Sequence, residues 1–188
     1  MDEGASVAED WAEVAGGFRA RVDGAVPESW DRPAPVPGWT ARDVVRHLVE
    51  WFPSLLEGGA GITLLVSTSV DDDPVAAWHE LEDGVTALLA DPDTPDRVLS
   101  NPHIGDVPVG QVVSRFFTPD VFMHTWDLAR ATGQDETLDQ QRCAEMLAGM
   151  EPLDEMLRQS GQYGPRVEVP DDADPQTRLI AFIGRDPR

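Results

Sequence analysis

The sequence predicts an all-α protein in which four helices pack as a bundle, with additional short helices and a small extended hairpin. Three observations support this fold class. Apolar residues recur at spacings of three and four over several stretches of the 188-residue chain. Stretches that contain proline or glycine separate these segments. Residues that cap helices, such as Thr40 and the Asp-Pro pair at 73–74, stand directly before the apolar segments.

A stiff connector separates the first two predicted helices. Residues 6–26 carry the apolar stripe of an amphipathic helix, through Val7, Trp11, Val14, Phe18 and Val22. Prolines at 27, 33, 35 and 37 exclude a helix over 28–38. The second helix begins at Thr40, with Asp43 as the acidic partner of a capping box, and we expect Pro53 to kink it or end its regular part. Glycines at 58, 59 and 61 then end the apolar pattern.

The third and fourth predicted helices lie on either side of a short segment of extended chain. Residues 63–73 have no clear period, and we expect them to form a mobile loop beside the functional site. A helix follows from 74 to about 91, and residues 98–107 predict a short hairpin. The fourth helix covers 110–132, with an interruption and kink at Pro119 and an end at Gly133.

The C-terminal part contains two more predicted helices. Residues 139–160 predict a fifth helix with Pro152 inside it, and a loop over 161–174 includes an edge segment at 167–170. A last short helix begins at the Asp-Pro pair 174–175 and ends at Gly184. We therefore expect one domain over residues 1–188, with a bundle core at about 5–160 and a C-terminal extension, 161–188, packed on it.

The composition is typical of a globular protein, with 41% hydrophobic and 26% charged residues and no apolar run long enough to cross a bilayer. The formal net charge is −21, and all 14 basic residues are arginine. Such a surface repels phosphate backbones and anionic lipids, so we expect a small-molecule substrate or thiol as partner, and neither nucleic acid nor a membrane. No secretion signal is visible, so we expect a cytoplasmic protein, either a monomer or a homodimer.

Asp120 and His124 are the first candidate metal ligands. They stand four apart in a predicted helix, which places both side chains on one face. A carboxylate oxygen and an imidazole nitrogen are donors that suit zinc and neighbouring divalent metals. Because two ligands rarely hold a metal well, a third should come from elsewhere in the fold. His47, in the apolar sector of the second helix, is the best candidate.

Each of these residues also has an interpretation without a metal. A lone buried histidine is more often satisfied by a carbonyl or carboxylate, and Asp120 could instead cap exposed helix amides. The three residues together favour a ligand set. Asp127, three residues after His124, either orients that ring or forms a salt bridge to Arg130 or Arg42, and the sequence leaves both interpretations open.

Several other residues with suitable chemistry fit structural roles better. Asp43 also stands four residues before His47, but the capping box explains it. We expect His79 on a helix surface and His103 in a solvent-facing turn. Trp51 and Trp126, which lie near the candidate histidines in sequence, are the tryptophans that could wall a ligand cavity, although aromatic residues at helical spacing usually belong to the core.

Motifs for other chemistries are missing from the sequence. There is no phosphate-binding glycine loop, no nucleophile elbow and no His-Glu-x-x-His. The single cysteine, Cys143, forms no internal disulfide and has no metal-binding or redox motif around it. A thiol for any thiol-dependent reaction must therefore come from outside the protein.

Two stretches resemble a known family. Residues 37–48, PGWTARDVVRHL, and 124–133, HTWDLARATG, resemble the metal-binding domain of mycothiol-dependent maleylpyruvate isomerases, which belongs to the DinB-like superfamily. The tail, at 163–165, 170–173 and 179–187, is similar to an uncharacterised single-domain branch of that family. The resemblance covers nearly the whole chain and implies a DinB-like four-helix bundle.

The resemblance also implies a site and a chemistry. In the isomerase, one histidine from the Trp-Thr helix and a Glu-x-x-x-His pair from a later helix hold the metal. The matching residues here are His47, Asp120 and His124, with aspartate in place of glutamate. The resemblance implies a zinc or nickel ion and a mycothiol-like thiol that takes part in S-transfer or isomerisation. It does not extend to maleylpyruvate as the substrate, because no match to the isomerase's separate C-terminal domain is visible. The alternative is a non-catalytic metal- or small-ligand-binding protein for sensing, sequestration or resistance.

Overall fold

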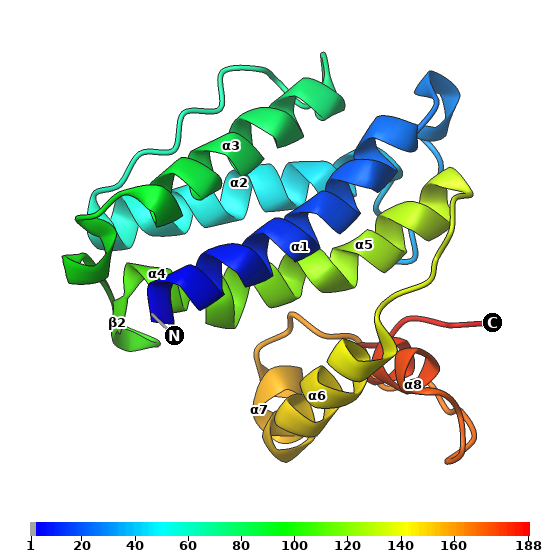
Figure 1. Ribbon diagram of the computed structural model, residues 1–188. Coiled ribbons are helices and arrows are strands. Elements are labelled where there is room, and N and C mark those ends of the chain that lie inside the picture. Colours follow the sequence, from blue (N-terminus) through cyan, green and yellow to red (C-terminus); the bar gives the residue numbers. More distant parts are fainter. Residues whose placement is uncertain (1–2) are drawn as a thin grey trace.

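The computed structural model describes residues 3–188, which are mostly helical (62%) with a small two-stranded hairpin. Four helices form the bundle in Figure 1, namely α1 (Glu3–Gly24), α2 (Ala41–Ala60), α3 (Pro74–Ala90) and α5 (Thr118–Thr132). Three shorter helices lie together against it, α6 (Gln140–Met150), α7 (Asp154–Gln159) and α8 (Pro175–Phe182). The predicted all-α bundle with short helices and a hairpin is confirmed. Within the described residues, no helix has the length and apolarity needed to cross a bilayer.

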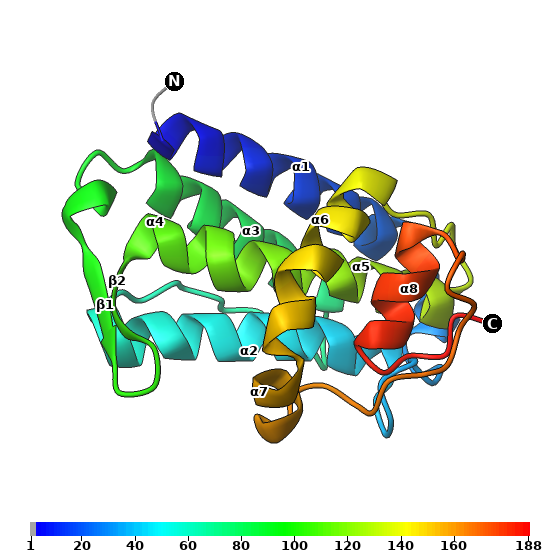
Figure 2. The same ribbon diagram turned by 90° about the horizontal axis from the view of Figure 1, so that it is seen from below.

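The bundle helices form a closed ring in which each contacts two neighbours. α1 packs against α3 and α5, and α2 packs against the same two helices. Figures 1 and 2 show that α1 and α5 run in one direction and α2 and α3 in the other. Because α2 and α3 are parallel, the connection over 61–73 must return along the whole length of the bundle. The fold is therefore a bundle with a crossover connection.

The start of α2 is fixed by the predicted capping box. The Thr40 hydroxyl accepts from the Asp43 amide at 3.3 Å, and the Asp43 carboxylate accepts from the Thr40 amide at 2.9 Å. Pro53 does not end the helix, which continues to Ala60 and stops at Gly61 with a φ of 63°. The apolar side of α2 is fully enclosed in the core, through Val44, Val45, Leu48, Phe52 and Leu56.

The connection over 61–73 is fastened to α3. The hydroxyl of Thr68 donates to Glu80 at 2.6 Å, and the hydroxyl of Ser67 donates to the same carboxylate at 3.0 Å. A groove of about 470 Å³ lies between this connection and the face of α2 that carries Arg46 and Glu50. His47 faces α5 instead, so the expectation of a loop beside the functional site is wrong.

The predicted hairpin is present and short. β1 (Val98–Asn101) pairs with β2 (Gly105–Pro108) in antiparallel register, with Leu99 opposite Val107. Both of these side chains are buried, so the hairpin adds to the core at the end of the bundle.

The helical segment that leads into α5 is interrupted before Pro119. α4 (Val109–Val112) is followed by a π-helical turn, η3 (Val113–Phe117), and then by α5. Pro119 has no N–H to continue the regular hydrogen-bond ladder, and a π turn is one way in which a helix absorbs such a break. The irregularity therefore lies one turn upstream of the position expected from the sequence.

The predicted fifth helix is divided in two. α6 ends at Met150, the 3₁₀ turn η4 (Glu151–Leu153) follows, and α7 then begins. Pro152 lies in η4, where its missing N–H prevents continuation of α6. The expected edge segment at 167–170 is not a strand, although the Val167 amide donates to the Ala181 carbonyl at 3.0 Å.

The layer of α6 and α8 covers the outer side of α5. α6 and α8 pack against each other, and residues 121–129 of α5 are all buried. The enclosed side chains of this layer join the bundle core in one cluster, through Leu138, Cys143, Leu147, Leu179 and Ile180. α5 is therefore the central helix of the molecule.

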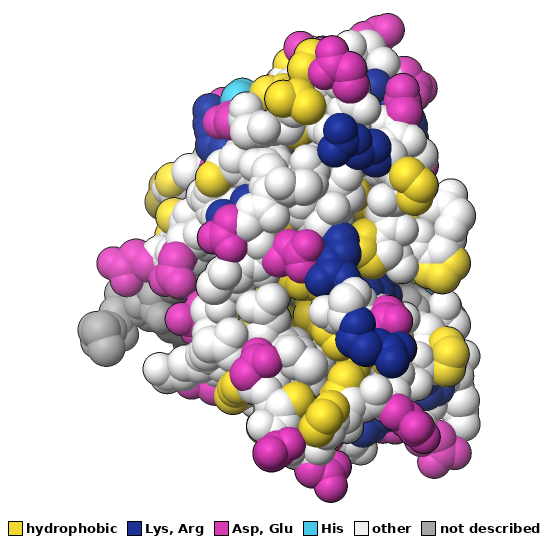
Figure 3. All heavy atoms as spheres, turned by 90° about the vertical axis from the view of Figure 1, so that its right-hand side faces the viewer, with side chains coloured by type: hydrophobic (Ala, Val, Ile, Leu, Met, Phe, Trp, Pro, Cys, Tyr) yellow, Lys and Arg dark blue, Asp and Glu magenta, His cyan; other side chains and the backbone are white. Residues whose placement is uncertain are grey.

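The surface carries charges of both signs in spite of the net charge of −21. Figure 3 shows one face, on which arginine side chains gather along the middle beside hydrophobic ones and acidic side chains lie among and around them. Many of these arginines form ion pairs with neighbouring carboxylates. In two examples, Arg46 lies 2.6 Å from Asp71 and Arg130 lies 2.6 Å from Glu136. Most arginine charge is thus compensated locally.

Candidate metal centre

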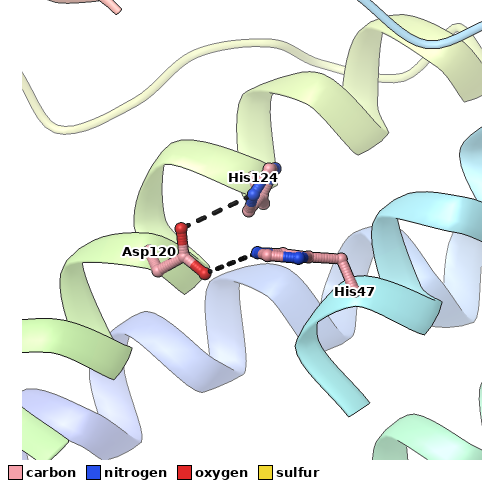
Figure 4. A group of neighbouring side chains, drawn as sticks. All are labelled: His47, Asp120 and His124. Carbon is pink, nitrogen blue, oxygen red and sulfur yellow. Dashed lines mark hydrogen bonds and ion pairs between the residues drawn. The ribbon is translucent and has the colours of Figure 1, made fainter. Parts of the chain in front are cut away.

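His47, Asp120 and His124 point toward one another between α2 and α5, as Figure 4 shows. The Nε2 atom of His47 lies 3.1 Å from Asp120 Oδ2, and the Nε2 atom of His124 lies 3.5 Å from Asp120 Oδ1. One ligand atom from each residue can be chosen such that all three lie within 4.8 Å of one another. The structure therefore brings together the three residues that the sequence predicted as ligands.

Local structure explains this meeting. Asp120 and His124 are separated by one helical turn of α5, so they share the face that looks toward α2. His47 lies on α2, the antiparallel neighbour of α5. Asp120 follows the π turn closely, and its carboxylate accepts hydrogen bonds from side chains of α2, so the interpretation of Asp120 as a helix cap is wrong.

The three side chains differ in exposure. The His47 side chain is 31% exposed and that of Asp120 is 22% exposed, whereas that of His124 is only 6% exposed. The cluster is therefore closed on the His124 side and open to solvent on the other side.

Two tryptophans complete the walls of the cluster. The indole N–H of Trp51 donates to Asp120 Oδ2 at 2.9 Å. The ring of Trp39 is stacked on the ring of His124, with centroids 5.8 Å apart, and lies 5.1 Å from the ring of His47. Trp51 was expected as a cavity wall, whereas Trp39 was not. The sequence feature that could have identified Trp39 is its position directly before the N-cap residue Thr40, where an apolar side chain commonly packs against the start of the helix.

Asp127 lies behind His124 and is fully buried. Its Oδ2 atom lies 2.9 Å from His124 Nδ1, so it does orient the ring. It also forms an ion pair, but with Arg185 rather than with the arginines considered from the sequence. Arg130 meets Glu136 instead, and Arg42 lies 3.6 Å from Asp31. Arg185 was missed because it stands 58 residues farther along the chain, with no local pattern around it.

The charges of the cluster stabilise one another. Burial works to raise the pKa of Asp120, but the His124 charge and the hydrogen bond from His47 outweigh it, so the pKa lies below its usual value. Burial works to lower the pKa of His124, and the Asp120 charge and the Asp127 hydrogen bond raise it above its usual value. Both pKa shifts favour the ionised forms, an aspartate beside an imidazolium, so the two residues form an ion pair at the edge of the core.

The remaining candidates lie elsewhere. Asp43 serves the capping box, and His79 contacts Asp23 at 2.7 Å on the surface. His103 is exposed in the hairpin turn. Trp126 is buried in the core with the Arg130 guanidinium over its ring, so it is not assigned to the cavity wall.

The donor set fits a divalent metal ion. Two imidazole nitrogens and one carboxylate oxygen are a common combination for zinc and for neighbouring transition metals. His124 is oriented by a carboxylate on its other nitrogen, which is the usual arrangement around a metal-binding histidine. The cluster could therefore hold a metal ion.

Comparison with known proteins identifies the family of this chain. Residues 11–61, which include His47, match the family described as mycothiol maleylpyruvate isomerase N-terminal domain. Two proteins of Mycobacterium tuberculosis, uncharacterized protein MT0763 (strain CDC 1551 / Oshkosh) and uncharacterized protein Rv0738 (strain ATCC 25618 / H37Rv), are each 33% identical over 162 residues, which is 81% of this chain and 83% of the relative. No solved structure gives a significant match. The chain therefore belongs to the mycothiol maleylpyruvate isomerase N-terminal domain family.

Proposed function

We propose that this protein is a divalent-metal-dependent enzyme that uses a low-molecular-weight thiol, such as mycothiol, for S-transfer or isomerisation. The observation that carries the proposal is the cluster of His47, Asp120 and His124, with ligand atoms within 4.8 Å and one side open to solvent. Three protein ligands with an open position are typical of catalytic rather than structural metal sites. The family name supports mycothiol as the thiol.

Zinc or nickel is the proposed ion, held by His47 Nε2, His124 Nε2 and the Asp120 carboxylate. When bound, such an ion lowers the pKa of a thiol or water molecule and presents it as a nucleophile. Aspartate in place of glutamate still brings its carboxylate to 3.1 Å from His47, so the shorter side chain spans the gap between α5 and α2.

The surrounding residues have positioning roles in this proposal. The Trp51 indole N–H holds one Asp120 oxygen, and Asp127 holds the rear nitrogen of His124. The stacked ring of Trp39 covers the His124 imidazole and excludes water from it. The open side of the cluster, next to His47, is where the thiol would enter.

The thiol must be supplied from outside. Cys143 is fully buried in α6, and burial, with the charges of Asp139 and Asp174, raises the pKa of its thiol to about 12. A thiol with that pKa carries almost no thiolate at neutral pH. This supports a co-substrate thiol rather than an internal one.

A cobalt-substituted protein tests the proposal. We expect wild-type protein to bind one Co²⁺ and to show a shifted absorption spectrum when mycothiol is added, as the thiolate enters the coordination sphere. His47→Ala should lose the spectrum, and His103→Ala, at an exposed turn, should keep it. A bound but unreactive ion would favour the non-catalytic binder. Protein that binds no Co²⁺, Zn²⁺ or Ni²⁺ would reduce the cluster to a structural feature.

A further inference from the structure

A buried ion pair lies directly behind the candidate metal centre. The Arg185 guanidinium meets both oxygens of Asp127, with Nε 3.2 Å from Oδ1 and Nη2 3.1 Å from Oδ2. The Asp127 side chain is 0% exposed and that of Arg185 is 10% exposed. Such a two-pronged contact fixes the carboxylate in orientation as well as in charge.

In neutral His124, the form that binds a metal ion, this pair determines which ring nitrogen carries the proton. A guanidinium has only donors, and the carboxylate opposite it is ionised and can only accept. The same Asp127 Oδ2 lies 2.9 Å from His124 Nδ1, so that nitrogen must be the donor. The remaining nitrogen, Nε2, then faces Asp120 and is the atom available to an ion.

Arg185 comes from the C-terminal segment rather than from the bundle. Its amide donates to the Ile180 carbonyl at 3.0 Å, at the end of α8. The residue before it, Gly184, has a φ of 86° and lies so close to Gly164 that an added Cβ would be 2.7 Å from the Gly164 Cα. This tight crossing of two backbone segments sets the position from which Arg185 reaches Asp127.

We propose that Arg185 is a positioning residue of the metal centre, which acts through Asp127 to hold Nε2 of His124 toward the ion and so links the C-terminal segment to metal affinity. The inference rests on the proposed metal site, but not on the thiol or on catalysis. A buried ion pair often stabilises a fold no more than apolar residues of similar size would. The proposal therefore gives the buried charge of Arg185 a role other than stability.

Arg178 provides a matched control. It lies on α8, seven residues before Arg185, and its contact with Glu151 at 3.7 Å is between side chains that are 44% and 46% exposed. Removal of this arginine changes the net charge by the same amount as removal of Arg185. It leaves Asp127 and His124 untouched.

The test compares full-length wild-type, Arg185→Met, Arg185→Lys and Arg178→Met proteins in Zn²⁺ competition titrations and in Co²⁺ absorption spectra. We expect Arg185→Met to bind Zn²⁺ about 10–100-fold more weakly with an altered Co²⁺ spectrum, Arg185→Lys to recover part of the affinity, and Arg178→Met to match wild type. Wild-type affinity and spectrum in Arg185→Met would overturn the inference while leaving the metal site intact. A wild-type protein that binds no metal would instead contradict the proposed function.

A second measurement does not depend on the folding of Arg185→Met. Long-range ¹H–¹⁵N spectra of zinc-loaded wild-type protein with labelled histidine report which ring nitrogen is protonated. We expect His124 to carry its proton on Nδ1 and to bind through Nε2. Binding through Nδ1 would overturn the assignment directly.

Discussion

The indole N–H of Trp51 donates to Asp120 Oδ2 at 2.9 Å, and the same oxygen lies 3.1 Å from His47 Nε2. Trp51 stands one turn after His47 on α2, so a single helix supplies both the predicted ligand and the group that aims its carboxylate partner. The orientation of Asp120 is therefore determined by α2 as much as by its own helix.

Trp51→Phe tests this relationship. The substitution keeps the aromatic wall but removes the N–H, so Asp120 loses one of the hydrogen bonds that orient it. We expect Zn²⁺ affinity to fall about tenfold, as for other partners of metal-bound carboxylates. The control is Ser54→Ala, on an exposed part of the same helix. Equal affinities in Trp51→Phe and wild type would show that the hydrogen bond does not orient the ligand.

Glu80→Gln tests how the crossover connection is fastened. Hydrogen bonds from the hydroxyl and amide of Thr68, and then from Ser67, lower the pKa of Glu80 from 4.5 to about 2. A carboxylate with a depressed pKa stabilises the fold above its unfolded pKa, and that contribution disappears as the pH falls from about 4.5 toward 2. We expect the variant to melt below wild type at pH 7, with the difference shrinking through this window. A constant difference from pH 7 to pH 2.5 would contradict the assignment.

Gly184→Ala tests the backbone crossing. Its φ of 86° is unfavourable for alanine, and the new Cβ would lie 2.7 Å from Gly164. We expect a loss of about 1–3 kcal/mol in the free energy of unfolding, measured by denaturant titration. Gly149→Ala is the opposite control, because this helical glycine has open space around it and the substitution should stabilise by about 0.5–1 kcal/mol. A neutral Gly184→Ala would mean that the crossing is easily displaced.

Alkylation of Cys143 tests the need for an external thiol. With a pKa of about 12 and no exposed surface, this thiol should not react with iodoacetamide in native protein at pH 8. Mass spectrometry should show unmodified native protein and one added group after unfolding in guanidinium chloride. Rapid modification of the native protein would make Cys143 a candidate nucleophile.

Local patterns in the sequence predicted much of this protein. The capping box of α2 and the Asp120–His124 pair depend on residues within four positions of each other, and the structure contains both. The meeting of His47 with that pair is a long-range contact across 73 residues, which no local pattern fixes. His47 was selected from its place in the apolar sector of the second helix, and the family resemblance implied the same residue. The metal itself stays a prediction.

The features that the sequence did not predict are of two kinds. Some depend on contacts between distant residues, and others on how a helix responds to an internal proline. Pro53 stays inside a continuous α2, whereas Pro152 coincides with the end of a helix and Pro119 follows a π turn. All three lack the same N–H, and tertiary packing decides how each segment responds. No local pattern pointed to Arg185, which is far from Asp127 in the sequence. Asp127 was correctly identified as a partner of His124, but the arginines considered for its ion pair were the wrong ones.

The ring order of the bundle has a consequence for how the chain folds. α1 and α5 are neighbours, although α2, α3 and the hairpin separate them in the sequence. The first three helices cannot enclose their apolar faces until α5 arrives, so the core closes late and through contacts of high sequence separation. During synthesis, the emerging chain therefore exposes apolar surface at least until α5 has left the ribosome.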